Sequence, residues 1–228
     1  MAIRAEPNFA DYQRQFEANY ERLNYANNLS SRVLAHSHAV LEKAFGPQDH
    51  FGKVLEVGAG SGQHAAYIRH GFDEYWLTDG NPNMLNQARK RIGSDERFRY
   101  QTENAAALSF EDGTFDRLIA THVLEHIIHP HEILREWGRV IRPGGTLSLV
   151  LPCDPGLAWR VGRSFGVRSR AESAGIDYDY WMAREHVNPI FNLVTFLEFY
   201  FQDIKASWWP LRVPFADVNL IYAANIRI

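Results

Sequence analysis

Residues 53–62 read KVLEVGAGSG, a short apolar strand that runs directly into a glycine-rich turn. Glycine in such a turn can adopt a positive φ, and it lets a ligand approach the backbone closely. A helix that begins after the turn would offer unpaired N–H groups and the positive end of its dipole, which suit a carboxylate or a phosphate. A tight turn without a ligand would also use glycine, so the turn alone leaves both interpretations open.

An acid follows at the position where a nucleoside ligand would need it. The next strand, expected over residues 74–79 (EYWLTD), ends at Asp79. In a doubly wound sheet this position borders the ligand crevice at the carboxyl ends of the strands. A carboxylate there can accept hydrogen bonds from both ribose hydroxyls, although it would also suit the N-terminus of the helix that begins at Pro82. Together, the turn and the acid predict a nucleoside ligand.

The rest of the chain alternates between strand and helix. We expect helices over residues 62–70, 81–92, 131–141 and 191–201, and strands over 98–104, 115–123, 146–152, 202–211 and 218–228, with a turn at 143–145. Asn81 is the expected N-cap of the second of these helices, with Pro82 at its first position. This alternation predicts a Rossmann-like, doubly wound α/β sheet, mostly parallel with an antiparallel C-terminal edge strand.

The flanking segments differ from this core. Apolar residues recur at helical spacing from Phe9 to Leu23 and from Leu29 to Phe45, which predicts an N-terminal helical cover. Residues 153–190 show no period, and a loop of that length is often functional. We therefore expect a single domain that consists of the cover (1–50), a cofactor-binding core (51–152), a substrate-region insertion (153–190) and a C-terminal helix with strands (191–228).

Composition narrows the class of protein. The chain has 228 residues, a formal net charge of -3 and one cysteine. A chain of this length can bury a core without disulfides, and its charge gives no reason to expect a nucleic-acid partner. It shows no apolar leader and no run of the ~18 uncharged apolar residues that a membrane span needs. We expect a cytoplasmic protein.

The glycine spacing distinguishes between nucleoside cofactors. The dinucleotide fingerprint G-x-G-x-x-G would place its third glycine at position 63, which is Gln63. The glycines stand instead at 58, 60 and 62 after Glu56, and this pattern resembles motif I of the class I S-adenosylmethionine-dependent methyltransferases. TDGNPNML (78–85), ENAAALSFEDGTFDRLIATHVLEHI (103–127) and GRVIRPGGTLSLVLP (138–152) resemble further segments of that family, in the family's order.

The resemblance implies S-adenosylmethionine as cofactor and a role for each matching residue. The methionine portion would lie along Gly58, Gly60 and Gly62, with Glu56 bracing the loop or reaching the amino group. The ribose would be held by Asp79 beside Gly80, the adenine amine by Asn104 and the adenine ring by the Ala105 N–H. Thr121 and His122 would face the sulfonium. The family more often has Asp at position 104, but asparagine can still accept through its carbonyl oxygen. Arg32 is a candidate partner for the cofactor carboxylate.

Methyl transfer mainly requires that the acceptor be aligned and desolvated, but a hydroxyl or ammonium acceptor must also lose a proton. His186, in MAREHVNP (182–189), is the best candidate base. A helix-end histidine exposed to solvent is the alternative, and Glu185, Asp154 and His38 are weaker candidates. His122, His126, His129 and His131 are clustered, but His126 belongs to the family's LEH segment and we expect no metal.

The acceptor is less defined by the sequence. Residues 154–181 combine Trp159, Phe165, Tyr178, Tyr180 and Trp181 with Arg160, Arg163, Arg168 and Arg170. This mixture suits a small-molecule or lipid-like acceptor that is apolar or aromatic and anionic, and it suits a solvated basic loop equally well. We expect methylation of an oxygen or nitrogen atom. A nicotinamide-dependent oxidoreductase and a non-catalytic S-adenosylmethionine-binding regulator are the alternatives, because fold alone does not fix function.

Overall fold

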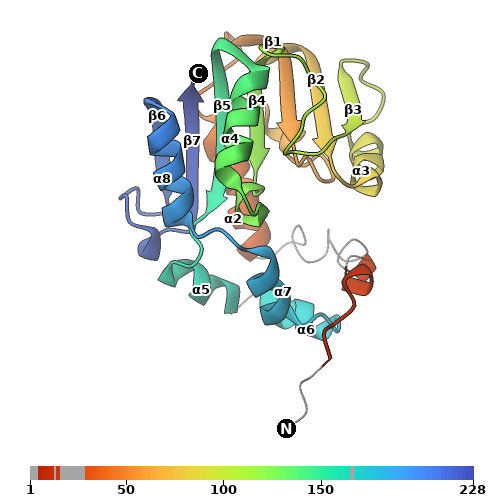
Figure 1. The fold of residues 1–228 in the computed structure, drawn as a ribbon, viewed down its shortest axis with the longest axis vertical. Coiled ribbons are helices and arrows are strands. Elements are labelled where there is room, and N and C mark those ends of the chain that lie inside the picture. Colours follow the sequence, from red (N-terminus) through yellow and green to blue (C-terminus); the bar gives the residue numbers. More distant parts are fainter. Residues whose placement is uncertain (1–4, 13, 16–28, 165–166) are drawn as a thin grey trace.

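The computed structural model describes residues 5–12, 14–15, 29–164 and 167–228 (Figure 1). The strands in these residues are β1 (His50–Val57), β2 (Gly71–Asp79), β3 (Phe98–Thr102), β4 (Phe115–Thr121), β5 (Ile141–Pro152), β6 (Asp203–Trp209) and β7 (Ile221–Arg227). They form one seven-stranded sheet in the order β3-β2-β1-β4-β5-β7-β6. β1 to β5 run parallel, and β7 runs antiparallel to both of its neighbours. The predicted Rossmann-like sheet, mostly parallel with an antiparallel C-terminal strand, is confirmed. That strand, β7, does not lie at the edge, because β6 pairs along its outer side.

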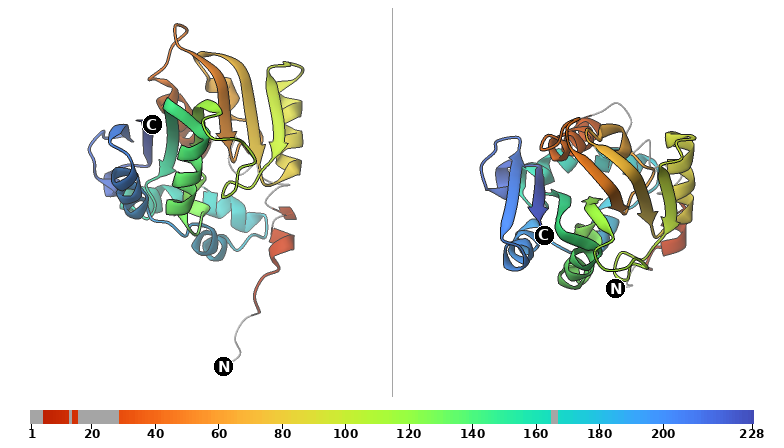
Figure 2. Two further views of the ribbon diagram at one scale, coloured as in Figure 1. Left: turned by 45° about the horizontal axis from the view of Figure 1, so that its top comes forward. Right: turned by 90° about the horizontal axis from the view of Figure 1, so that it is seen from above.

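Helices cover both faces of the sheet (Figure 2). On one face α2 (Leu29–Glu42) and α3 (Pro82–Ile92) bury Leu41 and Leu85 against the strands. On the other face α4 (Pro130–Val140) and α8 (Ile190–Tyr200) bury Trp137 and Leu197. Burial of apolar surface, at roughly 25 cal/mol per Å², is the main contribution that holds these layers together.

α3 begins and ends where its sequence predicts. The Asn81 side chain accepts a hydrogen bond from the Asn83 N–H at 2.9 Å, and Pro82 takes the first helical position. Gly93, at φ 84°, follows the last residue of the helix. This fixes the N-terminus of α3 three residues after Asp79, the last residue of β2.

The predicted helix over residues 62–70 is wrong in extent. Only η1 (His64–Tyr67) is helical there, as a 3₁₀ turn. Gly62 has a φ of +73°, which keeps the chain out of an α-helix at that point. His64 is buried and its Nε2 lies 3.0 Å from Glu42 Oε1, so the 3₁₀ turn is held by a tertiary contact.

The segment 153–190, which shows no period in the sequence, contains three short helices among its described residues. They are α5 (Leu157–Ser164), α6 (Val167–Ser173) and α7 (Tyr178–Glu185), and they lie beyond the carboxyl ends of the parallel strands (Figure 1). Helices of about two turns contain too few residues to display an apolar period. Two shorter 3₁₀ turns are η2 (Leu124–His126) and η3 (Ala216–Val218).

Several predicted boundaries shift. β3 and β4 end at Thr102 and Thr121, so Asn104 and His122 lie in the loops that follow. The turn predicted at 143–145 is part of β5. Of the predicted N-terminal stripe, Phe9 and Tyr12 are helical, whereas Phe16, Tyr20 and Leu23 lie outside the described residues. None of the helices among the described residues has the length and apolar character needed to span a bilayer.

Candidate active site

The glycine loop begins at the end of β1. Gly58 and Gly60 have φ values of +67° and +53°, in the left-handed region that favours glycine. A Cβ atom on Gly58 would lie 2.5 Å from Cγ2 of Val123, so no side chain fits there. A Cβ atom on Gly62 would lie 3.0 Å from Cβ of Ala88 in α3. Gly62 therefore allows α3 to pack closely, whereas Gly58 and Gly60 line a cavity.

Asp79 is tied to this loop. One carboxylate oxygen accepts a hydrogen bond from the Gly60 N–H at 2.9 Å, and the other accepts from the Asn81 N–H at 2.8 Å. Burial raises the pKa of Asp79, although the two backbone hydrogen bonds oppose that effect. Each oxygen keeps a lone pair for a further donor. The carboxylate is thus held in place and can still bind a ligand hydroxyl.

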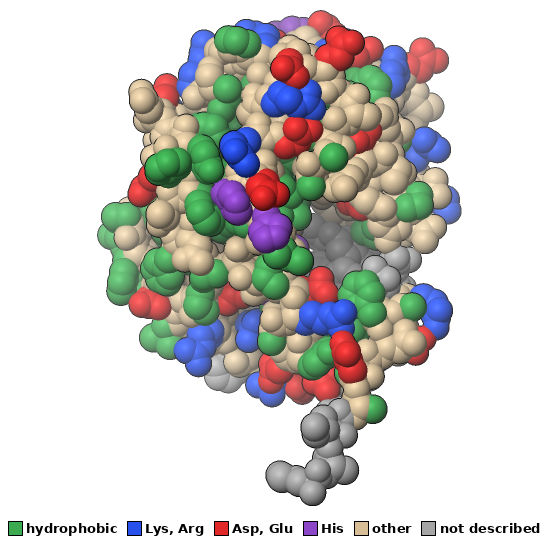
Figure 3. All heavy atoms as spheres, in the orientation of Figure 1, with side chains coloured by type: hydrophobic (Ala, Val, Ile, Leu, Met, Phe, Trp, Pro, Cys, Tyr) green, Lys and Arg blue, Asp and Glu red, His purple; other side chains and the backbone are tan. Residues whose placement is uncertain are grey.

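Two cavities meet at Gly58 and Asp79. The larger, of about 520 Å³, is also lined by Thr121, His122 and His186. The second, of about 470 Å³, is lined by Gly80, Thr102, Glu103, Asn104 and Ala105, among others. Figure 3 shows the molecule hollowed between the sheet and the helices α6 and α7. An elongated ligand could lie across the junction, with one end in each cavity.

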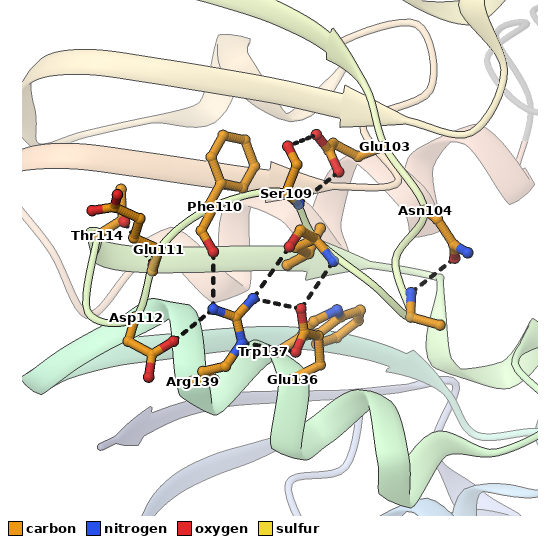
Figure 4. A network of polar contacts seen from close by, with 12 residues as sticks. Glu103, Asn104, Ser109, Phe110, Glu111, Asp112, Thr114, Glu136, Trp137 and Arg139 are labelled. Carbon is orange, nitrogen blue, oxygen red and sulfur yellow. Dashed lines mark hydrogen bonds and ion pairs between the residues drawn. The ribbon is translucent and has the colours of Figure 1, made fainter.

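The loop that carries Asn104 and Ala105 is held in place by α4 (Figure 4). Trp137 Nε1 donates to the Ala105 carbonyl at 3.0 Å, and Arg139 donates to the Phe110 carbonyl at 2.9 Å. Asn104 Oδ1 accepts from the Ala106 N–H at 3.0 Å, which leaves its second lone pair for a ligand. These contacts give the second cavity a preformed wall.

A buried acid faces the end of β4. His122 adopts a positive φ of 58°, which is uncommon for a residue with a side chain. Its Nδ1 lies 3.5 Å from Glu125 Oε1, and its Nε2 lies 3.3 Å from Ser37 Oγ. Burial alone would raise the pKa of Glu125, but His122, His126 and His186 lower that pKa below its usual value. Sequence reasoning did not single out Glu125, although it stands in the LEH segment.

His186 follows α7 and lies at the larger cavity. Its Nδ1 is 2.9 Å from Asp154 Oδ2, and both side chains are 13% exposed. An ionised carboxylate only accepts, so this contact places a proton on Nδ1 and leaves Nε2 as a base. The backbone N–H groups of Val187 and Asn188 donate to the Glu125 carbonyl at 2.9 and 3.1 Å. The end of α7 is thereby attached to the loop after β4.

Aromatic side chains cover the larger cavity. Tyr12 stacks on Trp181 with ring centroids 3.8 Å apart, and Phe9, Trp159 and Tyr178 also line it. Such rings exclude water while leaving an apolar surface for a ligand. Of the arginines noted in this region, Arg163 lines the cavity, with its guanidinium 5.6 Å from the Tyr178 ring centroid.

Comparisons with known proteins agree with this geometry. Residues 55–149 match the family described as a methyltransferase domain. Residues 55–149 therefore form a class I methyltransferase domain. The family resemblance indicated by the glycine spacing is confirmed. The alternative of a nicotinamide-dependent oxidoreductase is set aside. S-adenosylmethionine is the cofactor of this class.

Individual relatives match part of this chain. It is 34% identical over 101 residues to methyltransferase GfsG of Streptomyces halstedii, a match that covers 42% of this chain and 36% of that protein. It is 28% identical over 97 residues to a demethylmenaquinone methyltransferase of Clavibacter sepedonicus, covering 42% and 40%. The match therefore covers less than half of either relative.

A solved structure shows the same fold over nearly the whole chain. The N-methyltransferase NodS from Bradyrhizobium japonicum, in complex with S-adenosylhomocysteine, superposes with a TM-score of 0.68, covering 96% of this chain and 97% of that one. The two sequences are 15% identical, so the likeness establishes the shared fold.

The chain has residues that fit S-adenosylmethionine. Gly58 leaves room at the loop, and Asp79 stands where the two cavities join. Arg32, by contrast, is exposed and does not line either cavity, so the structure gives its assignment no support. Across the described part of the chain, no cluster of three or more His, Cys, Asp or Glu side chains is arranged to hold a metal ion.

Proposed function

We propose that this protein transfers the methyl group of S-adenosylmethionine to an oxygen or nitrogen atom of a small molecule bound in the larger cavity. One observation carries the proposal: His186 and the glycine loop line the same cavity, although they are far apart in the sequence. We assign the methionine portion of the cofactor to Gly58 and Gly60, its ribose to Asp79 and its adenine to the cavity beside Asn104.

The proposed chemistry needs few protein groups. When bound, the cofactor supplies an electrophilic methyl group. Asp154 orients the His186 ring, and His186 Nε2 takes the O–H or N–H proton of the acceptor, which leaves the acceptor lone pair free to attack. The aromatic cover around Tyr12 and Trp181 aligns the acceptor and keeps water away from it.

The charges of the cavity favour a neutral or amine-bearing acceptor over the anionic one expected from the sequence. Four acids line it, namely Glu56, Asp79, Glu125 and Glu185, while Arg163 is the one arginine among its described lining residues. A carboxylate or phosphate would lie in a negative field there. Val33, Leu34, Met84 and Leu220 add apolar contacts, so we propose an apolar acceptor with an amine or hydroxyl group.

A turnover screen tests the proposal. The purified protein is incubated with S-adenosylmethionine and matched apolar amines, phenols and carboxylic acids, and S-adenosylhomocysteine is measured. We expect product with amines or phenols and less with the acids. Thermal stabilisation by NADH, with none by either adenosyl compound, would contradict the cofactor assignment. Binding of S-adenosylhomocysteine without turnover of any acceptor would favour the alternative of a non-catalytic S-adenosylmethionine-binding regulator.

A further inference from the structure

A chain of buried polar side chains connects the centre of the sheet to the larger cavity. Arg117 Nη2 on β4 donates to Glu42 Oε1 on α2 at 2.6 Å. The same oxygen lies 3.0 Å from His64 Nε2, and His64 Nδ1 lies 3.0 Å from His38 Nδ1. All four side chains are buried. His38 and His64 line the cavity together with Gly60.

His38 Nε2 is buried and has no hydrogen-bond partner. Buried polar atoms in native proteins are nearly always satisfied, so an unpaired ring nitrogen on a residue that lines a cavity points to a ligand. The other ring nitrogen of His38 is occupied by His64. What Nε2 can bind therefore depends on which nitrogen carries the proton.

The charges of Arg117 and Glu42 favour one arrangement of protons on the two histidine rings. Burial alone would raise the pKa of Glu42, but the hydrogen bond from His64 and the charge of Arg117 bring it down to about 2. Arg117 and the ionised Glu42 neutralise each other, so a further positive charge on His64 would be buried without a matched anion. Glu56 is the next acid, and burial raises its pKa.

With one proton on its ring, His64 can donate to Glu42 only through Nε2, and its Nδ1 must then accept. His38 meets that acceptor with its own Nδ1, so the proton of His38 lies on Nδ1. Burial lowers the pKa of His38 well below its usual value, which keeps the ring neutral. The unpaired Nε2 is then an acceptor and cannot donate.

We propose that His38 Nε2 accepts a hydrogen bond from the ammonium group of the cofactor's methionine portion, with Glu42 and His64 holding His38 in the accepting tautomer. The inference rests on the proposed placement of that portion along the glycine loop. Of its two polar groups, the carboxylate only accepts hydrogen bonds and the ammonium only donates them, so an accepting nitrogen selects the ammonium. His64, two residues after Gly62, places His38 beside that loop.

His36 provides a matched control. It lies on the same helix, and its Nε2 is also buried without a partner. Its ring packs against Trp209, with centroids 4.5 Å apart, and it does not line the cavity. Replacing His36 by Phe should therefore change helix packing in the same way as replacing His38, without touching the cofactor.

Calorimetry with two ligands tests the proposal. S-adenosylhomocysteine and its analogue without the amino group are titrated into the wild type, His38→Phe and His36→Phe. We expect His38→Phe to weaken S-adenosylhomocysteine binding about 10- to 100-fold and to leave the analogue nearly unchanged, since the lost hydrogen bond involves a charged group. His36→Phe should change neither affinity. Equal weakening of both ligands by His38→Phe, or slower turnover at unchanged affinity, would overturn the proposal.

Nitrogen NMR of the unliganded wild type gives a second readout that needs no variant. The expected spectrum shows the His38 ring protonated at Nδ1 and unprotonated at Nε2, and a proton on Nε2 would overturn the inference. If the wild type binds neither adenosyl ligand, the proposed function itself fails. That outcome differs from equal weakening, which removes only the role of His38.

Discussion

The Asp79 carboxylate accepts a hydrogen bond from the Gly60 N–H at 2.9 Å, which makes the acid at the end of β2 part of the glycine loop. Because the other oxygen accepts from Asn81, the same side chain also connects the loop to the start of α3. A change at Asp79 should therefore affect both cofactor binding and the shape of the loop.

Asp79→Ala should weaken cofactor binding by ~1–3 kcal/mol, because the ribose hydroxyls lose a charged acceptor. Titration calorimetry with S-adenosylhomocysteine measures the change. Asp73→Ala is a suitable control, since Asp73 is exposed on the same strand and pairs with His50. Unchanged affinity in a folded Asp79→Ala protein would remove the ribose assignment.

His186→Ala should lower kcat by ~100- to 10,000-fold for an acceptor that must lose a proton, because that is the usual contribution of a general base. Cofactor affinity should stay close to that of the wild type. Asp154→Asn should lower kcat in the same direction, because an amide can no longer hold the His186 tautomer as an ionised carboxylate does. His131→Ala, which alters a half-exposed histidine outside the cavity, should have no effect. Turnover at the wild-type rate in His186→Ala would mean that alignment alone drives the reaction.

Gly58→Ala should destabilise the fold, because its Cβ atom would meet Val123 and its φ is positive. We expect a loss of about 2–4 kcal/mol in the free energy of unfolding, from backbone strain and overpacking together. Gly93→Ala shares the positive φ but meets nothing within 4 Å, so its cost should come from backbone strain alone, about 1–3 kcal/mol. Denaturant unfolding compares the two. If the contact with Val123 contributes, adding Val123→Ala should recover part of the unfolding free energy lost in Gly58→Ala. It should recover none of the loss in Gly93→Ala.

Stability should fall in acid because of Glu42. Its folded-state pKa of about 2 is below the ordinary value of 4.5, so its contribution is present above pH 4.5 and is lost as the pH falls toward 2. Unfolding free energies measured between pH 7 and pH 3 should drop less in Glu42→Gln than in the wild type. The variant should also be less stable at pH 7, because Arg117 loses its buried counterion. Identical pH dependence in the two proteins would contradict the assigned ion pair.

The sequence predicted those parts of the site that follow from strand order. Gly58, Asp79, Asn104 and His122 stand at or just after the ends of parallel strands, and such ends meet at one edge of a sheet. Local pattern could not show which way each residue faces. Gly62 looks equivalent to Gly58 in the sequence, yet it faces α3, because that depends on where the helix packs.

The rest of the site depends on contacts between distant segments. His38, His64 and Arg117 come from a helix, a 3₁₀ turn and a strand, and no spacing connects them in the sequence. The pairing of Asp154 with His186 likewise joins residues that are 32 positions apart in the sequence. The charge of Arg32 suggests a partner for the cofactor carboxylate, but Arg32 is exposed on α2.

The attachment of Val187 and Asn188 to the Glu125 carbonyl has a mechanical consequence. His186 immediately precedes this attachment, whereas α5 and α6 lie farther back along the chain. The imidazole is therefore kept in register with the loop after β4, at the end of a parallel strand.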